Sequence, residues 1–352
     1  MWIIRLFWQS LSSPSEMTES ISIKDMQEKK QGLGEDSTPL LLTLPKLTIL
    51  GVLDGMGGAG SSECDSDFGK HTQAYIASRI VGKCIEDFFN NKSSDYGSQD
   101  FAFVLRSIIK ERFQQEQSKY PIEQKIGLRG SMTKTYPSTL ALLCITQSDE
   151  GYILDSYWAG DSRNYLWNRE ALFQLSIDDV KGGMDPLRNL REDAPISNCL
   201  QADADFEIHH RQFGPFPTGE RFLVISATDG CFGYFPSPMD FEKSLNDALL
   251  HSSKTDEWQK LLSRNFARVT GDDFSYVIAA FGYKDFKELK RAMANYRPEL
   301  SSYFRNRKRF DKEMANLNNL QKSIDKLKRS LNQDIDSLWP DYKNRYLKYF
   351  KD

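Results

Sequence analysis

Residues 47–58 constrain the fold of this chain more than any other stretch. They form an apolar, partly β-branched run that ends in Asp54 and continues into a glycine-rich turn, LTILGVLDGMGG. This pattern predicts a buried strand that carries a carboxylate to its own end. The glycines after Asp54 allow a close approach of the backbone to a ligand. A lone Asp-Gly pair is usually only a turn, so the interpretation as a ligand site depends on the rest of the chain.

The composition leaves room for a sizeable core and divides the charge unevenly. Of the 352 residues, 39% are hydrophobic, which allows one large domain or two. Residues 286–352 contain 17 Lys and Arg residues and 9 Asp and Glu residues, a net charge of +8. The rest of the chain contains 29 Lys and Arg residues and 40 Asp and Glu residues, a net charge of -11. An acidic body suits a cation site and a basic tail suits an acidic partner, although both are also ordinary for solvated surfaces.

Cysteine usage and hydropathy predict a cytoplasmic protein. The five cysteines are scattered and show neither a CxxC pair nor zinc-ligand spacing, so we expect reduced thiols. No run reaches the ~20 apolar residues that a membrane span needs, so none is expected. The apolar start, residues 1–8, lacks a basic first region and a small-residue cleavage site, so we expect no signal peptide.

Hydrophobic periodicity predicts alternating groups of strands and helices. Strands fit residues 40–44, 47–53, 138–146, 152–159, 162–167, 171–175, 206–211, 221–227 and 275–281. Helices fit residues 66–89, 100–117, 238–250 and 256–267. A hairpin of the first two strands would bring Glu35 and Asp36 near Asp54. Residues 180–204, rich in Gly, Pro, Asp and Asn, are expected to form a long surface loop.

The pattern changes to long helices from residue 284 onward. Leu and Ile recur every three or four residues from Leu317 to Leu338, which predicts a short coiled-coil-like seam that ends at Pro340. We expect an accessory helical hairpin that docks a protein partner or a second copy through residues 286–339. Packing of the helices on themselves or on the body remains open. Nucleic acid is not expected, because no base-reading motif accompanies the positive charge.

Acidic residues mark the ends of several predicted strands: Glu35, Asp36, Asp54, Asp229 and Asp272, with Asp161 at a further turn. Clustered carboxylates repel one another and are costly to desolvate, and divalent cations relieve both problems. Ligation by oxygen alone favours Mg²⁺ or Mn²⁺. Two such ions can hold a bridging hydroxide and stabilise an in-line displacement at phosphorus.

With these motifs in order, residues 35–282 resemble the metal-dependent protein phosphatase 2C (PPM) family. VLDGMGG (52–58) is similar to the family's V-F-D-G-H-G-G, in the Met form frequent among bacterial members. PSTL (137–140) resembles G-S-T-A, AGDSR (159–163) resembles V-G-D-S-R, and LSIDD (175–179) resembles L-T-x-D-H. SATDG (226–230) resembles A-S-D-G, and DDFS (272–275) resembles the final D-N-x-S/T.

The resemblance implies an α/β sandwich of four layers, in which helices flank two antiparallel β-sheets, plus the helical extension at the C-terminus. It implies two Mn²⁺ or Mg²⁺ ions. Asp54 would bridge both, the Gly55 carbonyl would bind one, and Asp229 and Asp272 would bind the other. Glu35 and Asp36 would contact the ions through water, and Thr139 would form a hydrogen bond in the catalytic site. Asp161 with Asp229 would hold a third, weaker ion. Asp273, where the family usually has Asn, would have a supporting position.

The resemblance therefore predicts a protein serine/threonine phosphatase acting on phosphorylated protein substrates. Three departures define the alternative, a pseudophosphatase that serves as a binding or regulatory module. Gln31 stands where the family has a phosphate-clamping Arg, Met56 replaces the proposed general-acid His, and Gly233 replaces an expected acid. The expected division of the chain is an N-terminal segment (1–34), a catalytic domain (35–283) and a basic helical extension (284–352).

Overall fold

The computed structural model describes residues 21–93, 96–97, 100–121, 133–182, 185–192, 194–294 and 297–347. The apolar start discussed above, residues 1–8, lies outside these ranges. The chain divides into two compact units, residues 1–296 and residues 297–352, and each is described by itself. In the described residues, no helix combines the length and the apolar character that a membrane crossing requires.

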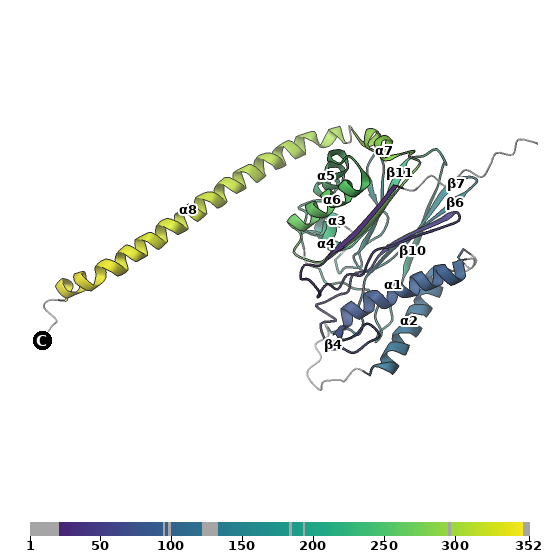
Figure 1. Cartoon of the computed structure of the whole chain (residues 1–352), viewed down its shortest axis with the longest axis horizontal. Coiled ribbons are helices and arrows are strands. Elements are labelled where there is room, and N and C mark those ends of the chain that lie inside the picture. Colours follow the sequence, from purple (N-terminus) through teal and green to yellow (C-terminus); the bar gives the residue numbers. More distant parts are fainter. Residues whose placement is uncertain are drawn as a thin grey trace, which may run out of the picture. The chain divides into compact units, whose positions relative to one another are not determined.

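Two antiparallel sheets of five strands form the centre of the first unit (Figure 1). The β12 sheet has the order β1 (Ile21–Gln27), β12 (Phe274–Phe281), β11 (Phe222–Ala227), β8 (Arg163–Trp167) and β9 (Leu172–Gln174). The β3 sheet has the order β10 (His209–Phe216), β7 (Gly151–Ala159), β6 (Leu140–Ser148), β3 (Leu47–Val52) and β2 (Leu40–Leu44). A separate two-stranded ribbon pairs β4 (Glu63–Cys64) with β5 (His71–Thr72).

Helices cover the outer face of each sheet (Figure 1). The β3 sheet packs against α1 (Gln73–Lys92) and α2 (Phe101–Lys119). The β12 sheet packs against α4 (Asp229–Phe232), α5 (Pro238–His251), α6 (Thr255–Val269) and α7 (Phe286–Met293). A short helix, α3 (Pro186–Asn189), interrupts the long loop 180–204. The predicted four-layer sandwich of two antiparallel sheets flanked by helices is confirmed.

The strand β3 shows why its sequence is apolar throughout. All six of its residues are buried, because one face meets the helices and the other meets the second sheet. Ile49 belongs to the core beneath α1 and α2, whereas Leu50 and Val52 belong to the core between the sheets. Alternate side chains of a strand point to opposite faces, so a strand in a central layer needs apolar residues at every position.

The structure differs from the expected boundaries at three places in this unit. The segment 1–34 was set apart, yet β1 pairs along its whole length with β12. The first long helix begins at Gln73 and not at residue 66, because the Thr72 side chain caps it by accepting a hydrogen bond from the Tyr75 N–H. β10 begins at His209 and not at residue 206, and its register shifts between Phe213 and Phe216.

The second unit contains one long helix, so the predicted hairpin that ends at Pro340 is wrong. A single turn of 3-10 helix, η2 (Pro298–Leu300), leads into α8 (Ser301–Tyr346), which runs for 46 residues and passes through Pro340. The sequence offers no glycine after Gly282, and therefore no glycine turn that could reverse the chain. Residues 284–294, expected in the extension, instead join the first unit, where Leu289 and Met293 of α7 are fully buried.

Candidate metal centre

The predicted acidic residues meet at one edge of the sandwich because the strands are antiparallel. In such sheets the C-terminal end of one strand lies beside the N-terminal end of the next. Asp54 follows β3, Asp161 follows β7 and precedes β8, and Asp229 follows β11. Asp272 precedes β12, and the Glu35–Asp36 pair lies in the loop between β1 and β2. Both sheets thus bring carboxylates to the same edge.

A cavity of about 360 Å³ opens at this edge. The residues that line it are Glu35, Asp54, Gly55, Met56, Gly57, Gly58, Ala59, Asp161, Ile196, Asp229, Asp272 and Asp273. Seven of the predicted site residues are among them. The other two, Asp36 and Thr139, lie beneath the cavity and are almost completely buried. The structure therefore brings the predicted set together, in a lining layer and a layer below it.

The layer below the cavity holds Asp54 in place. The Thr139 N–H donates to the Asp54 carbonyl at 2.8 Å, and the Ser138 hydroxyl donates to the same carbonyl at 3.0 Å. The Thr139 hydroxyl accepts from the Asp54 N–H at 3.3 Å and bonds to the Ser162 hydroxyl at 2.7 Å. Thr139 thus couples the end of β3 to the turn that carries Asp161, and it does so from a position outside the cavity lining.

Asp273 fixes the loop that carries Glu35. Its carboxylate accepts hydrogen bonds from the Lys29 N–H at 2.7 Å and from the Glu35 N–H at 2.8 Å. The Glu35 carboxylate in turn accepts from the Thr72 hydroxyl at 2.6 Å. Thr72 is also the residue that caps α1, so the same hydroxyl serves the helix and the site. Sequence reasoning did not identify Thr72, because no motif marks a capping residue as a neighbour of a distant acid.

Asp36 is the most deeply buried acid of the set and is 2% exposed. The Thr228 hydroxyl donates to its carboxylate at 2.9 Å. Burial raises the pKa of Asp36 to about 8, against the effect of that hydrogen bond, and the nearby Asp229 and Asp273 raise it further. Thr228 was also missed by sequence reasoning, although it directly precedes the predicted ligand Asp229.

The electrostatics of the cavity show an excess of negative charge. Desolvation raises the pKa of Asp54 well above its ordinary value, and the charges of Asp36, Asp229 and Asp161 add to this rise. Desolvation and the charge of Asp229 likewise raise the pKa of Asp161 to about 8. The pKa values of Glu35 and Asp229 are raised as well, first by desolvation and then by neighbouring acids. Like charges held in a desolvated site disfavour ionisation in this way.

The donor set fits a hard divalent cation. Every polar side chain in the cavity lining is a carboxylate, and carboxylate oxygens are the ligands that Mg²⁺ and Mn²⁺ prefer. Within the described ranges, no three Asp, Glu, His or Cys side chains lie close enough together to form a finished metal site. A cation among these carboxylates would remove both their mutual repulsion and the upward pKa shifts.

Two glycines of the turn after β3 make close contacts with neighbouring groups. A Cβ atom on Gly55 would lie 2.3 Å from the Ala74 carbonyl oxygen in the first turn of α1. A Cβ atom on Gly57 would lie 1.7 Å from a carboxylate oxygen of Glu35. Gly58 has no atom within 4 Å of such a Cβ position. The turn therefore packs its backbone directly against α1 and against the Glu35 loop.

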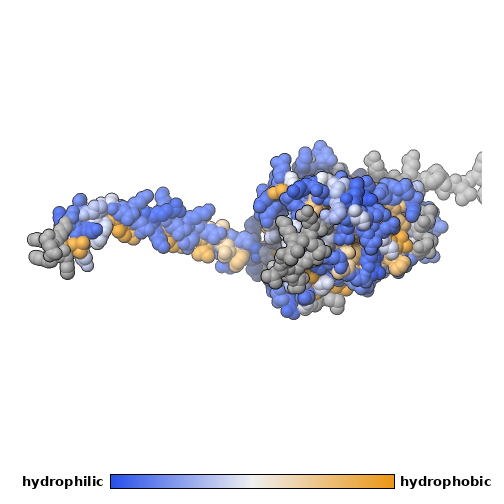
Figure 2. Space-filling model, turned by 90° about the horizontal axis from the view of Figure 1, so that it is seen from below, coloured by the Kyte–Doolittle hydropathy of each residue, from blue (hydrophilic) through white to orange (hydrophobic). Residues whose placement is uncertain are grey.

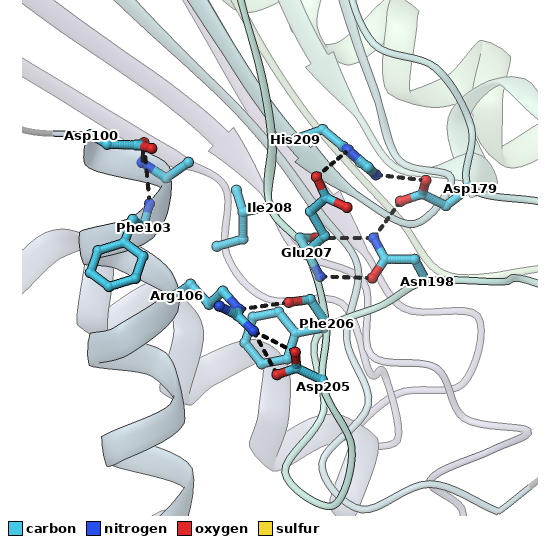
Figure 3. Close-up of a pocket in the computed structure, with 11 residues that line it drawn as sticks. Asp100, Phe103, Arg106, Asp179, Asn198, Asp205, Phe206, Glu207, Ile208 and His209 are labelled. Carbon is cyan, nitrogen blue, oxygen red and sulfur yellow. Dashed lines mark hydrogen bonds and ion pairs between the residues drawn. The ribbon is translucent and has the colours of Figure 1, made fainter.

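Asp179 links the Asp161 turn to a second cavity (Figure 3). It stands at the position of the family's His in the L-T-x-D-H motif. Its carboxylate accepts from the Gly160 N–H at 3.0 Å and from the Asn198 amide at 2.7 Å, and it pairs with the His209 ring at 2.9 Å. The second cavity, of about 620 Å³, lies between the N-terminal part of α2 and the segment 205–209. One side chain thus connects the site turn, the long loop and β10.

Two of the three departures from the family pattern, Met56 and Gln31, occupy different places. Met56 lines the cavity, and its thioether carries no proton to donate. Gln31 is exposed, in the loop after β1. Arg79, on α1, donates to the Glu35 carbonyl at 2.9 Å and to the Gly34 carbonyl at 3.3 Å, and its guanidinium stacks 3.4 Å from the centre of the Tyr75 ring. The Arg79 guanidinium therefore binds the backbone of the loop that carries Glu35 and Asp36.

Comparison of the sequence with family models gives one match that spans most of the chain. The model described as protein phosphatase 2C matches residues 27–267. The chain belongs to the protein phosphatase 2C family. The matched stretch includes Asp54, Asp161 and Asp229 and ends before Asp272 and Asp273, which the structure places in the same cavity. No curated protein matches the sequence.

Solved structures of low sequence identity share the protein phosphatase 2C fold. A Caenorhabditis elegans sex determining protein matches with a TM-score of 0.55 and 16% identity, over 77% of this chain and 67% of that chain. The Mycobacterium tuberculosis serine/threonine phosphatase PstP/Ppp matches with a TM-score of 0.50 and 18% identity, over 74% of this chain and 98% of that chain. A bacterial serine phosphatase matches with a TM-score of 0.50 and 15% identity, over 74% and 97%.

Proposed function

We propose that this protein phosphatase 2C family member is an Mn²⁺- or Mg²⁺-dependent phosphatase that hydrolyses phosphoserine and phosphothreonine in protein substrates. The observation that carries the proposal is the cavity at the sandwich edge; among the described residues its polar side chains are all carboxylates, those of Glu35, Asp54, Asp161, Asp229, Asp272 and Asp273. The raised pKa values of Asp54, Asp161 and Asp229 support it, because a cation in the cavity would relieve the repulsion that raises them. The family match supplies the reaction class.

In this proposal each residue has a defined task. Asp54 and the Gly55 carbonyl would hold two ions with Asp229 and Asp272, and Asp161 with Asp229 would offer a third, weaker position. When bound, the ions supply Lewis-acid stabilisation of the phosphoryl oxygens and lower the pKa of water. Thr139 keeps Asp54 at the end of β3, and Asp273 keeps Glu35 over the cavity. Because Met56 has no proton to give, the leaving oxygen would take its proton from water or from another group of the site.

The test is hydrolysis of a chromogenic phosphate ester and of phosphoserine and phosphothreonine peptides by the purified full chain. We expect activity with Mn²⁺ or Mg²⁺ and loss of activity with a chelator. Asp54→Asn should lower activity by about 100-fold or more and weaken Mn²⁺ binding in calorimetry. Asp205→Asn is the matched control, since this carboxylate is exposed and pairs with Arg106 and Lys110 away from the cavity. It should leave activity unchanged.

Two outcomes would contradict the proposal. Turnover that persists in chelator would exclude the metal-dependent reaction. Mn²⁺ binding without turnover of any phosphopeptide would support the pseudophosphatase alternative. In that case Gln31→Arg is informative, because Arg supplies the bidentate phosphate contact that Gln cannot. A large gain of activity in this variant would show that the site lacks only the arginine that binds the substrate phosphate.

A further inference from the structure

The helix α8 carries a continuous apolar stripe that its own unit leaves uncovered. The stripe consists of Phe310, Met314, Leu317, Leu320, Ile324, Leu327, Leu331, Ile335, Leu338 and Tyr342, each between 40% and 68% exposed. Successive members are three or four residues apart, so they lie on one side of the helix. Figure 2 shows apolar side chains gathered along one side of α8 and hydrophilic ones over the rest of its visible surface.

An uncovered stripe of this length calls for a partner. From Phe310 to Tyr342 it extends about 48 Å along the helix, at 1.5 Å per residue. Single surface Leu side chains are unremarkable, but contiguous apolar strips mark interaction surfaces. Most of the stability of a helix in a protein comes from the packing of its apolar face against another element. Within the described residues 297–347, no second helix covers the stripe.

The charges beside the stripe are segregated along the helix. Residues 303–312 contain five basic side chains and one acidic side chain, a net charge of +4. Residues 331–342 contain three acidic side chains, Asp334, Asp336 and Asp341, and no basic one, a net charge of -3. The middle of the stripe has the strongest apolar pattern, with Leu317, Leu320, Ile324 and Leu327 spaced as in a heptad repeat.

We propose that α8 forms an antiparallel coiled coil with α8 of a second copy of this chain. In the register that centres the pair near residue 322, Leu317 packs against Leu327 of the other copy and Leu320 packs against Ile324. The basic segment 303–312 then lies against the acidic segment 332–341 of the other copy, at both ends of the pair. The contact is isologous, so it closes as a two-fold dimer and cannot extend into a filament.

Charge complementarity selects the antiparallel orientation and the second copy. A parallel pair would place the +4 segment against itself and the acidic side chains of residues 331–342 against their own copies, which is destabilising. In the antiparallel register the residues that border the apolar seam near its centre are Gln321, Ser323, Asn316 and Ser330, and Lys322 lies on the side of the helix away from the seam, so no like charges meet in the seam. One helix therefore contains both halves of a complementary surface, and no acidic partner from elsewhere is needed to match its basic part.

The oligomeric state of the full chain tests the proposal. We expect sedimentation equilibrium to show a dimer. The double variant Leu320→Asp with Leu327→Asp should raise the dimer dissociation constant by about 100-fold or more, because it places charges in the apolar seam. The matched control is Asn318→Asp with Asn319→Asp, which adds the same charge on the polar side of the helix, outside the segments 303–312 and 332–341, and should leave association unchanged. Circular dichroism checks that the control variant keeps the helix content of the unmodified protein.

Orientation is tested by cysteine cross-linking in the full chain. When Asn316→Cys and Ser330→Cys proteins are mixed and oxidised, an antiparallel pair should form the mixed disulfide, whereas a parallel pair would cross-link each variant with itself. Unmodified protein is the control for the native cysteines, four of which are buried. Any of four results would overturn the proposal. The first two are a monomer in sedimentation, and binding of α8 only to anionic vesicles or to another protein. The other two are equal effects of the seam and control variants, and cross-links that join each cysteine variant only with itself.

Discussion

Arg163 and Asp178 form a two-pronged ion pair under the turn that presents Asp161 to the cavity. The Arg163 Nε donates to Oδ1 of Asp178 at 2.8 Å, and Nη2 donates to Oδ2 at 2.6 Å. Both side chains are 3% exposed. The guanidinium carbon also lies 4.3 Å from the centre of the Phe232 ring. This pair locks the start of β8, two residues after Asp161.

Removal of one partner of this pair should be strongly destabilising. Asp178→Asn would leave the Arg163 charge buried without its counter-ion, at a cost of about 3–5 kcal/mol. Urea unfolding of the purified protein measures the loss. The control is Glu192→Gln, which breaks the exposed pair between Arg188 and Glu192, both 56% exposed, and should change stability by less than about 0.5 kcal/mol. Equal effects of the two substitutions would show that burial of the ion pair does not matter.

The glycines of the turn after β3 allow a prediction with a control in the same turn. Gly55→Ala should destabilise the protein by about 1–3 kcal/mol and weaken Mn²⁺ binding, because the new Cβ would lie 2.3 Å from the Ala74 carbonyl oxygen. Gly58→Ala meets no atom within 4 Å and should be nearly neutral. Unfolding curves and Mn²⁺ titrations of both variants provide the measurement. A neutral Gly55→Ala would contradict the close contact between the turn and α1.

Much of the fold could be predicted from the sequence because buried strands in a sandwich carry strong local signals. β3 and β11 are apolar at nearly every position, since both of their faces are covered. β1 was missed for the opposite reason. It lies at the edge of its sheet, only Ile23 of its residues is buried, and its sequence ISIKDMQ alternates too weakly to be distinguished from a polar segment.

The candidate site was predictable in part for a related reason. The acids follow or precede apolar strands, so their positions at one edge follow from the antiparallel pairing. The contacts of Thr72 with Glu35, Thr228 with Asp36 and Asp179 with His209 join residues that are 30 to 192 positions apart. Such contacts depend on tertiary structure and leave no local pattern. The hairpin predicted for the tail is wrong because α8 continues as one helix through Pro340, and no glycine follows Gly282 at which the chain could reverse.

The acid cluster predicts how stability depends on pH and metal. The pKa values of Asp36 and Asp161 rise from an ordinary value near 4 to about 8 in the folded protein. Between these values the folded state binds more protons than the unfolded state, so the stability of metal-free protein should fall as the pH rises from about 4 to about 8. Thermal unfolding in chelator across this pH range measures the effect.

Added Mn²⁺ should reverse that trend, because the cation binds the ionised carboxylates. At a free concentration of 100 times its dissociation constant it should stabilise the folded state by about 2.7 kcal/mol. The increase in melting temperature on adding Mn²⁺ should therefore be larger at pH 8 than at pH 5. If metal-free protein instead gains stability as the pH rises through this range, the acids do not form the coupled, desolvated cluster described above.

Two truncations test where the first unit ends. Its last helix, α7, buries Leu289 and Met293 completely, and its Phe286 ring lies 5.9 Å from the ring of Trp258 on α6. Arg221, which directly precedes β11, pairs with Glu288 at 2.5 Å. We therefore expect a protein that ends at residue 296 to keep the stability and the metal-dependent activity of the first unit. A protein that ends at residue 285 should lose both, because the core beneath α7 becomes exposed.

A point substitution separates packing from chain length. Leu289→Ala in the full chain should cost about 2–5 kcal/mol, since it removes a buried side chain from the core. Leu320→Ala, on the exposed stripe of α8, should leave the unfolding of the first unit unchanged. Thermal unfolding of both variants, followed by the near-ultraviolet signal of the tryptophans packed in the first unit, makes the comparison. If the chain ending at residue 285 unfolds at the same temperature as the chain ending at 296, α7 belongs to the extension and the division after residue 296 is incorrect.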